Sequence, residues 1–245
     1  YIINLNNNPV IINGPQSTNI YNQCDPYEIL SVYEEQKLKN KSFNVCANNL
    51  TKYYYDKCGI KISAYLFDSC DVLDFSANIS STINSARFFL VYPFWNKTES
   101  DYYFLDEILI DNGKEGRISI FVTQEKILKV RFMENNGVET TLSTDVKNWN
   151  EEEWAAIMVS LAQNNSVSEN KELFLSFKNL HNETNNALVT REVVDFRLVG
   201  DFVHQFWGSD INGKNSANAV IAKADISYFL PSDPNYNPTF IDLFR

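Results

Sequence analysis

Carboxylates are the residues of this chain whose types and spacing come nearest to a catalytic arrangement. In the segment LDEILIDNG the charged residues are Asp106, Glu107 and Asp111. Retaining hydrolysis of a glycosidic bond needs two carboxyl groups about 5 Å apart, and alternate residues of a strand share a face. Three apolar residues separate Glu107 from Asp111, and no further carboxylate continues the alternation. We therefore interpret this segment as a strand with charged ends.

The two histidines, His181 and His204, give no indication of a second route to catalysis. They are far apart in the sequence, and neither stands beside a plausible nucleophile, although the spacing leaves a Cys–His or Ser–His–Asp arrangement open. The chain has no G-x-G-x-x-G segment and no P-loop. We expect His204, in FVHQFW, to be a structural strand residue.

The charge of the chain excludes two classes of partner. Its net charge is −10 and its pI is near 4.7, with Lys and Arg scattered singly. Nucleic-acid binders carry a basic patch, and anionic lipid repels an acidic surface, so we expect no contact with either. The longest strongly apolar run, residues 88–95, is too short to span a bilayer. The chain starts at Tyr1, so we interpret it as a fragment or processed product, with any signal peptide or membrane anchor outside it.

The cysteines favour an oxidising compartment. All four fall in the first 70 residues, and none forms a close C-x-x-C pair of the kind that binds zinc: Cys24, Cys46, Cys58 and Cys70. We expect two disulfides in place of four free buried thiols. Of the three possible connectivities, all open from the sequence, we choose Cys46–Cys58 and Cys24–Cys70. Six sequons permit N-glycosylation: Asn40, Asn49, Asn78, Asn96, Asn164 and Asn182. The chain is therefore expected to be secreted or at the cell surface.

The pattern of residues predicts an all-β fold. The chain is 44% hydrophobic and 14% aromatic, which suffices for a sizeable core. From residue 71 strand-like runs follow one another, with the turn signals Asn112-Gly113 and Asn136-Gly137 between them. Alternation places three sets of residues on one face each: Ile118, Ile120 and Val122; Leu128, Val130 and Phe132; Leu173, Leu175 and Phe177. We predict an antiparallel β-sandwich over 71–245, preceded by a cysteine-bearing segment, 1–70, that forms extra strands or a small subdomain.

One segment, NWNEEEWAAIMVSL at 148–161, has two interpretations. Its Glu, Ala, Met and Leu favour a helix by propensity. The surrounding meander favours a strand over 153–161, covered on both faces because apolar residues alternate on both sides. We predict the strand. The acidic run 151–153 could bind a cation, but a solvated turn explains it better.

From about Val72 to Phe244 the order of segments resembles a laminin-G-like domain, within the concanavalin A-like lectin and glucanase group. The resemblance rests on ARFFLVYPFW, the pair GRISIFVTQEKILKVRFMENNGVETTLST, the strand WNEEEWAAIMVSL around a central Trp, KELFLSFKN, and FWGSDINGKNSANAVIAKADISYF. The chain departs from the family pattern at Ala155, where the family often has His, and at Lys178-Asn179, where it usually has Gly. The first 70 residues match nothing in the family.

The resemblance implies a concanavalin A-like jelly roll with Trp154 buried between the two sheets. Glycanases of the group place two glutamates around an aspartate at alternate strand positions, a motif that this chain lacks. Laminin-G-like domains often bind Ca²⁺ at one rim through oxygen ligands. The candidate ligands here are Asp111 in DNG and Asp210 in DING, although ordinary turn chemistry explains both loops equally well.

The tyrosines could stack on a sugar, because a tyrosine ring offers a flat apolar face with a polar tip. The candidates are Tyr53, Tyr54, Tyr55, Tyr102 and Tyr103. Cross-strand packing is the interpretation that we favour.

The sequence as a whole predicts a non-catalytic, extracellular module for binding or adhesion that recognises a protein or a glycan. The contact is expected first in the 208–218 loop, at Asp210, Asn212 and Asn215, and second at 111–116, because sandwich loops carry recognition. No cofactor is expected other than Ca²⁺. The alternatives are a glycoside-active enzyme on the same fold and a structural spacer or assembly domain.

Overall fold

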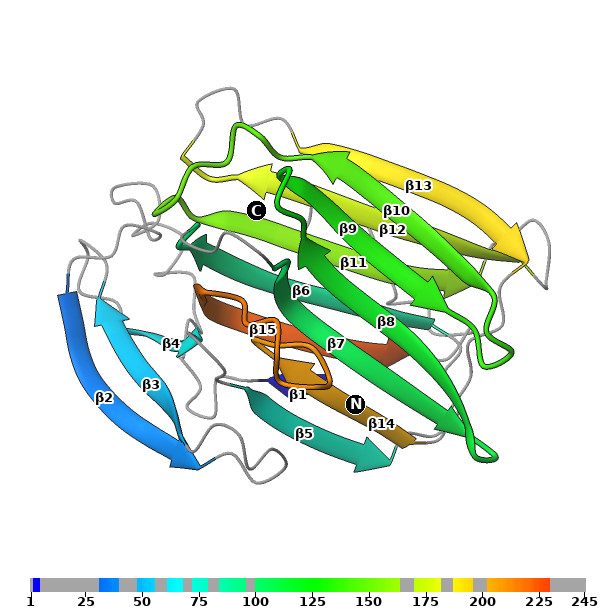
Figure 1. Ribbon diagram of the computed structural model, residues 1–245, viewed down its shortest axis with the longest axis horizontal. Coiled ribbons are helices and arrows are strands. Elements are labelled where there is room, and N and C mark those ends of the chain that lie inside the picture. Colours follow the sequence, from blue (N-terminus) through cyan, green and yellow to red (C-terminus); the bar gives the residue numbers. More distant parts are fainter. Residues whose placement is uncertain are drawn as a thin grey trace, which may run out of the picture.

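A computed structural model describes residues 2–4, 31–39, 48–55, 61–67, 72–78, 84–95, 100–163, 170–181, 187–195 and 202–229. Throughout these residues the chain forms strands and turns without a helix, and the strands pair into two antiparallel sheets that lie one over the other (Figure 1). The predicted all-β, antiparallel sandwich is therefore confirmed. No helix in this part of the chain is long and apolar enough to cross a membrane.

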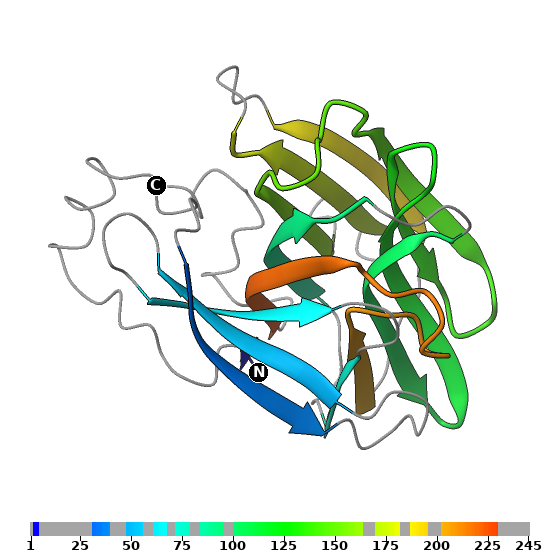
Figure 2. The same cartoon turned by 60° about the vertical axis from the view of Figure 1, so that its left-hand side comes forward.

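The larger sheet has the order β13-β12-β11-β6-β15-β4-β3-β2, and β1 also pairs with β15. Its strands are β1 (Ile2–Asn4), β2 (Ser31–Lys39), β3 (Asn48–Tyr55), β4 (Lys61–Phe67), β6 (Asn84–Pro93), β11 (Ala155–Gln163), β12 (Asn170–Asn179), β13 (Leu188–Asp195) and β15 (Ala219–Phe229). Seen from the side, β2 and β3 continue this sheet beyond β4 (Figure 2). The first described strands thus hydrogen-bond onto the sandwich, while a domain boundary at residue 70 stays a prediction.

The smaller sheet has the order β10-β9-β8-β7-β14-β5. Its strands are β5 (Leu73–Asn78), β7 (Tyr102–Asp111), β8 (Lys114–Val122), β9 (Ile127–Met133), β10 (Glu139–Asp145) and β14 (Phe202–Trp207). The β7–β8 hairpin closes through Asn112 and Gly113, whose φ angles are 49° and 76°. Positive φ at both central residues defines the turn type that Asn-Gly predicts.

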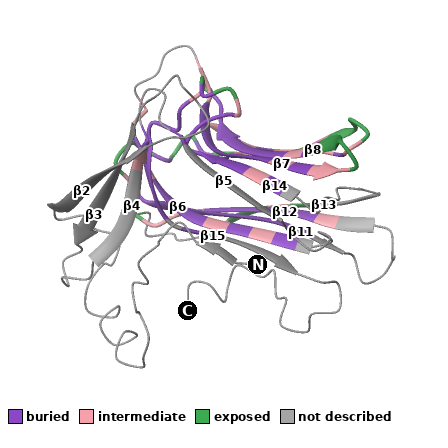
Figure 3. Ribbon diagram, turned by 90° about the horizontal axis from the view of Figure 1, so that it is seen from below, coloured by how far each residue is buried: buried purple, intermediate pink, exposed green. Residues whose placement is uncertain are grey.

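The main core fills the space between the two sheets (Figure 3). The three alternating sets predicted from the sequence all point into it: Ile118, Ile120 and Val122; Leu128, Val130 and Phe132; Leu173, Leu175 and Phe177. Aromatic rings meet across the layers, for example Phe89 of β6 and Trp207 of β14, whose centroids are 5.4 Å apart. Full burial of each such side chain contributes about 1.5–3 kcal/mol, so this layer supplies most of the stability.

The segment with two interpretations leads into strand β11, between β12 and β6, so the strand prediction is confirmed. The strand covers Ala155–Gln163, two residues later than the predicted 153–161. Its inward residues include Ile157 and Val159, while Trp154, Ala156 and Met158 belong to a second cluster made by the larger sheet alone. Trp154 is buried, but the prediction that it lies between the sheets is wrong. Successive strand residues alternate in direction, so a tryptophan next to the inward-facing Ala155 must face the other way.

Trp149, five residues earlier, occupies the place between the sheets that the resemblance assigned to Trp154. Its ring lies 5.1 Å from that of Phe177, and its indole N–H donates to the carbonyl of Glu153 at 2.8 Å. This bond fastens the turn before β11 to the core. The indole nitrogen of Trp154, by contrast, is buried and finds no hydrogen-bond partner in the part of the chain that is described.

Several predictions fall outside the described residues. The cysteines Cys24, Cys46, Cys58 and Cys70 lie there, as do the sequon residues Asn40, Asn96, Asn164 and Asn182. Asn49 lies in β3 and Asn78 at the end of β5. The disulfides and the glycosylation therefore stay predictions.

Candidate binding face

Adjacent residues of β7 carry two buried carboxylates that point to opposite faces of the smaller sheet. Glu107 points into the core, where it accepts hydrogen bonds from Nε and Nη2 of Arg87 on β6, at 2.9 and 2.7 Å. Arg87 also donates to the hydroxyl of Ser85 at 2.7 Å. Arg87 and Glu107 are both fully shielded from solvent. This ion pair bridges the two sheets and offers nothing to a ligand.

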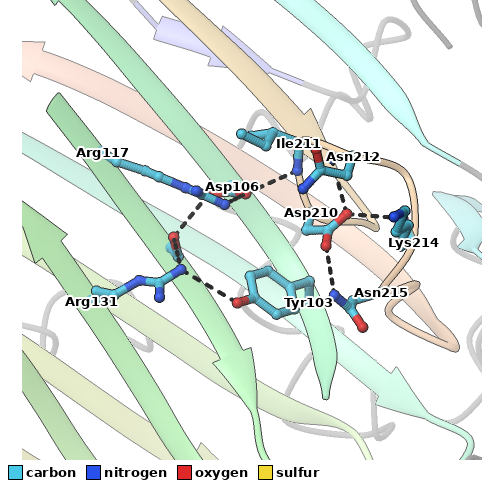
Figure 4. Close-up of polar contacts among 10 residues, drawn as sticks. Tyr103, Asp106, Arg117, Arg131, Asp210, Ile211, Asn212, Lys214 and Asn215 are labelled. Atoms are coloured by element: carbon cyan, nitrogen blue, oxygen red, sulfur yellow. Dashed lines mark hydrogen bonds and ion pairs between the residues drawn. The ribbon is translucent and has the colours of Figure 1, made fainter. Parts of the chain in front are cut away.

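Asp106 points to the outer face and is fully buried there by its own partners. Its carboxylate accepts two hydrogen bonds from Arg117 of β8, one from Nε at 2.7 Å and one from Nη2. It accepts a third from the hydroxyl of Ser119 at 2.9 Å. A fourth bond comes from the backbone N–H of Ile211 at 3.0 Å. Asp106 thus joins the sheet to a loop more than a hundred residues away, as Figure 4 shows.

The Arg117 guanidinium reflects this setting. Burial lowers its pKa, but the hydrogen bond and the negative charge of Asp106 outweigh burial and raise the pKa overall. The guanidinium therefore stays charged at any physiological pH.

That loop, residues 208–218, connects β14 to β15 and is organised around Asp210. One carboxylate oxygen of Asp210 accepts the backbone N–H groups of Asn212 and Lys214, at 3.1 and 2.9 Å. The other accepts the side-chain amide of Asn215 at 2.6 Å. Backbone N–H groups of a loop lack the partners that a neighbouring strand provides, and a carboxylate that accepts these groups supplies the missing hydrogen bonds. The loop is therefore fixed internally as well as through Asp106.

Both ends of the loop are also fixed. Gly208 donates to the carbonyl of Phe104 at 2.9 Å and accepts from the N–H of Ala217 at 2.7 Å. Its φ is +81°, and a Cβ there would come within 2.0 Å of the ring of Phe67, so only glycine fits. Asn218 closes the loop by donating to the carbonyl of Phe94.

Beside Asp106, the outer face carries a stacked aromatic pair and a second arginine. The rings of Tyr103 and Phe121 are parallel within 6°, with centroids 4.7 Å apart. Arg131 of β9 lies over Phe121, its guanidinium carbon 5.8 Å from the ring centroid, and donates long bonds to the hydroxyls of Tyr103 and Ser119, at 3.4 and 3.5 Å. Burial raises the pKa of the Tyr103 phenol, so it stays protonated.

A separate cluster lies at the rim formed by the β8–β9 turn. The ammonium nitrogen of Lys126 lies 3.3 Å from the ring centroid of Trp95, which packs edge-on against Trp149 and Tyr102. This nitrogen has no hydrogen-bond partner among the described residues. Burial lowers the pKa of Lys126 to about 8, against a smaller opposing effect of Glu151.

The structure brings Asp210, Asn212 and Asn215, the predicted ligand-binding residues, together in one loop. Asp210 and Asn215 are bonded to each other, whereas the side chain of Asn212 is exposed, as is that of Lys214. Asp111, the second candidate metal ligand, lies at the β7–β8 turn and accepts from Asn112 at 3.0 Å. An antiparallel strand rises about 3.4 Å per residue, so Asp111 lies roughly 17 Å along β7 from Asp106, where the Asp210 loop docks.

These positions do not suit Ca²⁺. The oxygens of Asp210 are directed at N–H groups, which a cation would have to displace. Within the described ranges no three His, Cys, Asp or Glu side chains gather to hold a metal. Calcium needs six to eight oxygen ligands. We therefore assign no step to a metal.

The other candidates take structural positions. Tyr102 packs against Trp95 in the core, and Tyr103 stacks on Phe121, while for Tyr53, Tyr54 and Tyr55 of β3 only the backbone is described. His204 lies in β14 with its ring 4.2 Å from that of Phe206. His181 lies exposed after β12.

The acidic run forms a turn before β11. Glu153 accepts the backbone N–H and side-chain amide of Asn150, at 3.1 and 2.9 Å, and the amide of Asn179 at 2.8 Å. Burial raises the pKa of Glu153, but these bonds lower it overall. Glu151 and Glu152 are exposed. The predicted turn is present, with Glu153 as its hydrogen-bonded anchor.

Sequence reasoning missed Asp106 as the anchor of the loop and Arg131 as part of the outer face. The signal for Arg131 was present: in ILKVRFM, Lys129 and Arg131 alternate with residues predicted to be in the core, which places both on the outer face. No local signal existed for Asp106, because its partners come from β8 and from the distant loop.

The sequence matches no protein-family model and no curated protein. Among solved structures, it is similar to the enzymatically active domain of tailspike protein 2 of bacteriophage CBA120, at 13% identity and a TM-score of 0.47, over 80% of this chain and 28% of that one. It is also similar to the botulinum neurotoxin type G receptor binding domain, at 11% identity and a TM-score of 0.38, over 74% of this chain and 46% of that one. A third similar structure is a SAP-like pentraxin from Limulus polyphemus, at 10% identity and a TM-score of 0.42, over 65% of this chain and 71% of that one. The chain thus spans less than a third of the tailspike domain. All three TM-scores are below 0.5, so the description of the fold and the proposal for the function rest on the geometry of this chain alone.

Proposed function

We propose that this chain is a non-catalytic binding module that recognises a partner through its outer face. This face consists of the outward side of β7, β8 and β9 together with the 208–218 loop. The observation that carries the proposal is the fixed loop, held to the sheet by Asp106 and internally by Asp210. A loop fixed before binding loses little conformational entropy when a partner docks.

The contact residues that we propose are Asn212 and Lys214, whose side chains are exposed at the tip of the loop. Asp210 and Asn215 serve to shape the loop, because their polar groups already bond to one another. This refines the ligand-binding set expected from the sequence. The partner is a glycan or a protein, met outside the cell or at its surface, and no cofactor is required.

Two observations support binding without catalysis. The neighbouring carboxylates Asp106 and Glu107 face opposite sides of the sheet, and each is neutralised by an arginine. Retaining hydrolysis needs two carboxyl groups about 5 Å apart on one side of a substrate. We further propose that the chain is a laminin-G-like domain of the concanavalin A-like group, on the order of its sequence motifs.

The proposal is tested by screening the whole 245-residue chain against a broad glycan array and against labelled cell-surface proteins. For the partner identified, Asn212→Ala and Lys214→Ala should each weaken binding about 2- to 10-fold, the effect of losing one hydrogen bond. Asn148→Ala and Lys147→Ala, on the exposed loop before β11, are matched controls and should leave binding unchanged.

The same samples are examined by mass spectrometry for altered glycans or peptides. The proposal predicts none. Turnover of any substrate, or the absence of any partner in both screens, would contradict the binding function. Binding that the two loop variants leave unchanged would contradict the contact residues.

A further inference from the structure

Arg131 differs from the other arginines of the described residues in having no carboxylate partner there. The other three are ion-paired: Arg87 with Glu107, Arg117 with Asp106, and Arg191 with Glu172. Arg131 makes only two long hydrogen bonds, both from Nη2, to the hydroxyls of Tyr103 and Ser119. In a chain with a net charge of −10, a guanidinium without a carboxylate partner among the described residues needs an explanation.

The position of Arg131 is fixed by the sheet. It lies on a continuous ladder, opposite Thr141 of β10 on one side and Ser119 of β8 on the other. The stacked pair of Tyr103 and Phe121 limits the guanidinium from a third side, and Figure 4 shows the bond from Arg131 to the Tyr103 hydroxyl. Its Nε and Nη1 groups have no hydrogen-bond partner among the described residues, so they remain available to an anion.

We infer that Arg131 anchors an acidic oligosaccharide on the outer face. The inference rests on the proposed binding function and adds the chemical class of the partner. A guanidinium forms two parallel hydrogen bonds to a carboxylate, which is how a uronic-acid sugar would be held. The hydroxyls of Thr141 and Ser143 are exposed on the outward side of the neighbouring strand β10 and suit the hydroxyls of the sugar.

A sugar fits this face better than a protein does. Protein interfaces bury apolar and aromatic anchors at their centres. The large hydrophobic side chains exposed in the described residues are Val138, Leu188 and Val189, none of which lies on the outward side of β7, β8 or β9. The aromatic pair beside Arg131 is itself almost entirely buried. Other apolar side chains on this face, among them Ile108 and Ile110 of β7 and Met133 of β9, are only partly exposed, so a protein partner would find no fully exposed apolar anchor here.

Charge around Arg131 also suits an anion. Lys129, two residues from Arg131 on β9, lies on the same face, while Arg117 and Asp106 neutralise each other. The exposed acids on this side of the sheet include Glu115 of β8 and Glu139 and Asp145 of β10. Glu139 accepts a bond from Thr141 at 3.4 Å, and Asp145 is paired with Lys147. Because the chain as a whole is acidic, the attraction is local and should weaken as salt rises.

The test uses the whole chain and three probes: oligomers of galacturonic, mannuronic and glucuronic acid, the same oligomers after reduction of their carboxyl groups, and a short polyglutamate peptide. We expect binding to at least one uronic-acid oligomer and at least tenfold weaker binding to its reduced form. Arg131→Gln should weaken that binding about tenfold or more, the effect of losing a charged hydrogen bond. Arg131→Lys keeps the positive charge but cannot form two parallel hydrogen bonds, so its affinity should lie between those of the wild type and Arg131→Gln.

Arg191→Gln, at an exposed arginine of the larger sheet, is the matched control, and melting temperatures verify that each variant is folded. Equal binding of wild type and Arg131→Gln, equal binding of reduced oligomers, or tighter binding of polyglutamate would overturn the inference. So would the absence of binding to every uronic-acid oligomer. If Asn212→Ala and Lys214→Ala still weaken binding of another partner, the proposed function stands while this inference falls.

Discussion

Asp106 and Glu107 are consecutive residues of β7, both fully buried and both paired with an arginine, yet their side chains have different structural roles. Glu107 faces the larger sheet and meets Arg87 in a closed layer of side chains. Asp106 faces outward and divides its bonds between Arg117, Ser119 and the backbone of the 208–218 loop. Strand alternation alone separates the two environments.

The difference shows where a buried charge serves the fold and where it serves a site. The Arg87–Glu107 pair could be replaced by apolar side chains, because desolvation offsets most of its electrostatic attraction. Asp106 could not be replaced so simply, because a hydrophobic side chain cannot accept the N–H of Ile211. The outer carboxylate therefore positions the candidate binding loop, whereas the inner one holds two sheets together.

The largest effect is expected from breaking the inner pair on one side. Glu107→Leu leaves the Arg87 guanidinium buried without its counter-charge and should lower the free energy of unfolding by about 3–5 kcal/mol. Urea titration measures this. The double variant Arg87→Met/Glu107→Leu should recover most of the loss. If the double variant were as unstable as the single one, the pair would be essential to packing, and the contrast with Asp106 would fail.

Gly208→Ala is expected to cost somewhat less. The new methyl group would overlap the Phe67 ring, and the residue would keep a positive φ of 81°. Strain and overpacking together suggest a loss of about 2–4 kcal/mol in the same urea titration. Gly113→Ala, where a Cβ meets nothing within 4 Å, is the matched control and should cost clearly less. Equal losses would mean that the start of the loop is not confined by Phe67.

Asp106→Asn keeps the shape of the side chain but removes its charge. It weakens the bonds from Arg117 and from the loop, so we expect a loss of about 2 kcal/mol in stability. Hydrogen exchange should accelerate at the amide of Ile211 while the amides of β11 keep their protection. Unchanged exchange at Ile211 would show that Asp210 alone holds the loop.

Much of the fold could be predicted from the sequence because it depends on local alternation. The inward sets on β8, β9 and β12, the Asn-Gly turns and strand β11 all follow from side-chain period and turn chemistry. The position of Trp154 could not be predicted in this way. Alternation places Trp154 on the same face of the strand as Ala156 and Met158, but it does not say whether that face or the opposite one packs against the second sheet. The resemblance supplied that choice, and it was wrong.

The candidate site was less predictable for a physical reason. Asp106 and Glu107 were interpreted as a charged strand end, because the arginines that bury them come from β8 and β6. Such pairing depends on sheet order, which alternation does not encode. The 208–218 loop, in contrast, was predicted as the first contact surface from its polar, turn-rich composition, and that role stays a prediction.

The smallest expected effect concerns Lys126 at the rim. Its pKa in the folded chain is about 8, below the ordinary 10.5, so between these values the unfolded chain binds more protons. Stability should therefore rise as pH increases from about 8 to 10.5. The side chain is only half-buried, so solvent screening limits the gain to about 1 kcal/mol. Lys126→Met should abolish this rise in urea titrations, and a rise of the same size in that variant would assign it to another group.

The measurement that tests the account most directly compares partner binding by two variants, Asp106→Asn and Arg87→Met/Glu107→Leu. The partner is the glycan or protein that the screens identify, and affinity is measured by calorimetry at matched salt. We predict that Asp106→Asn weakens binding at least severalfold, because it releases the loop, while the double variant binds as the wild type does. Normal binding by Asp106→Asn together with lost binding by the double variant would contradict the assignment of the outer face as the binding surface.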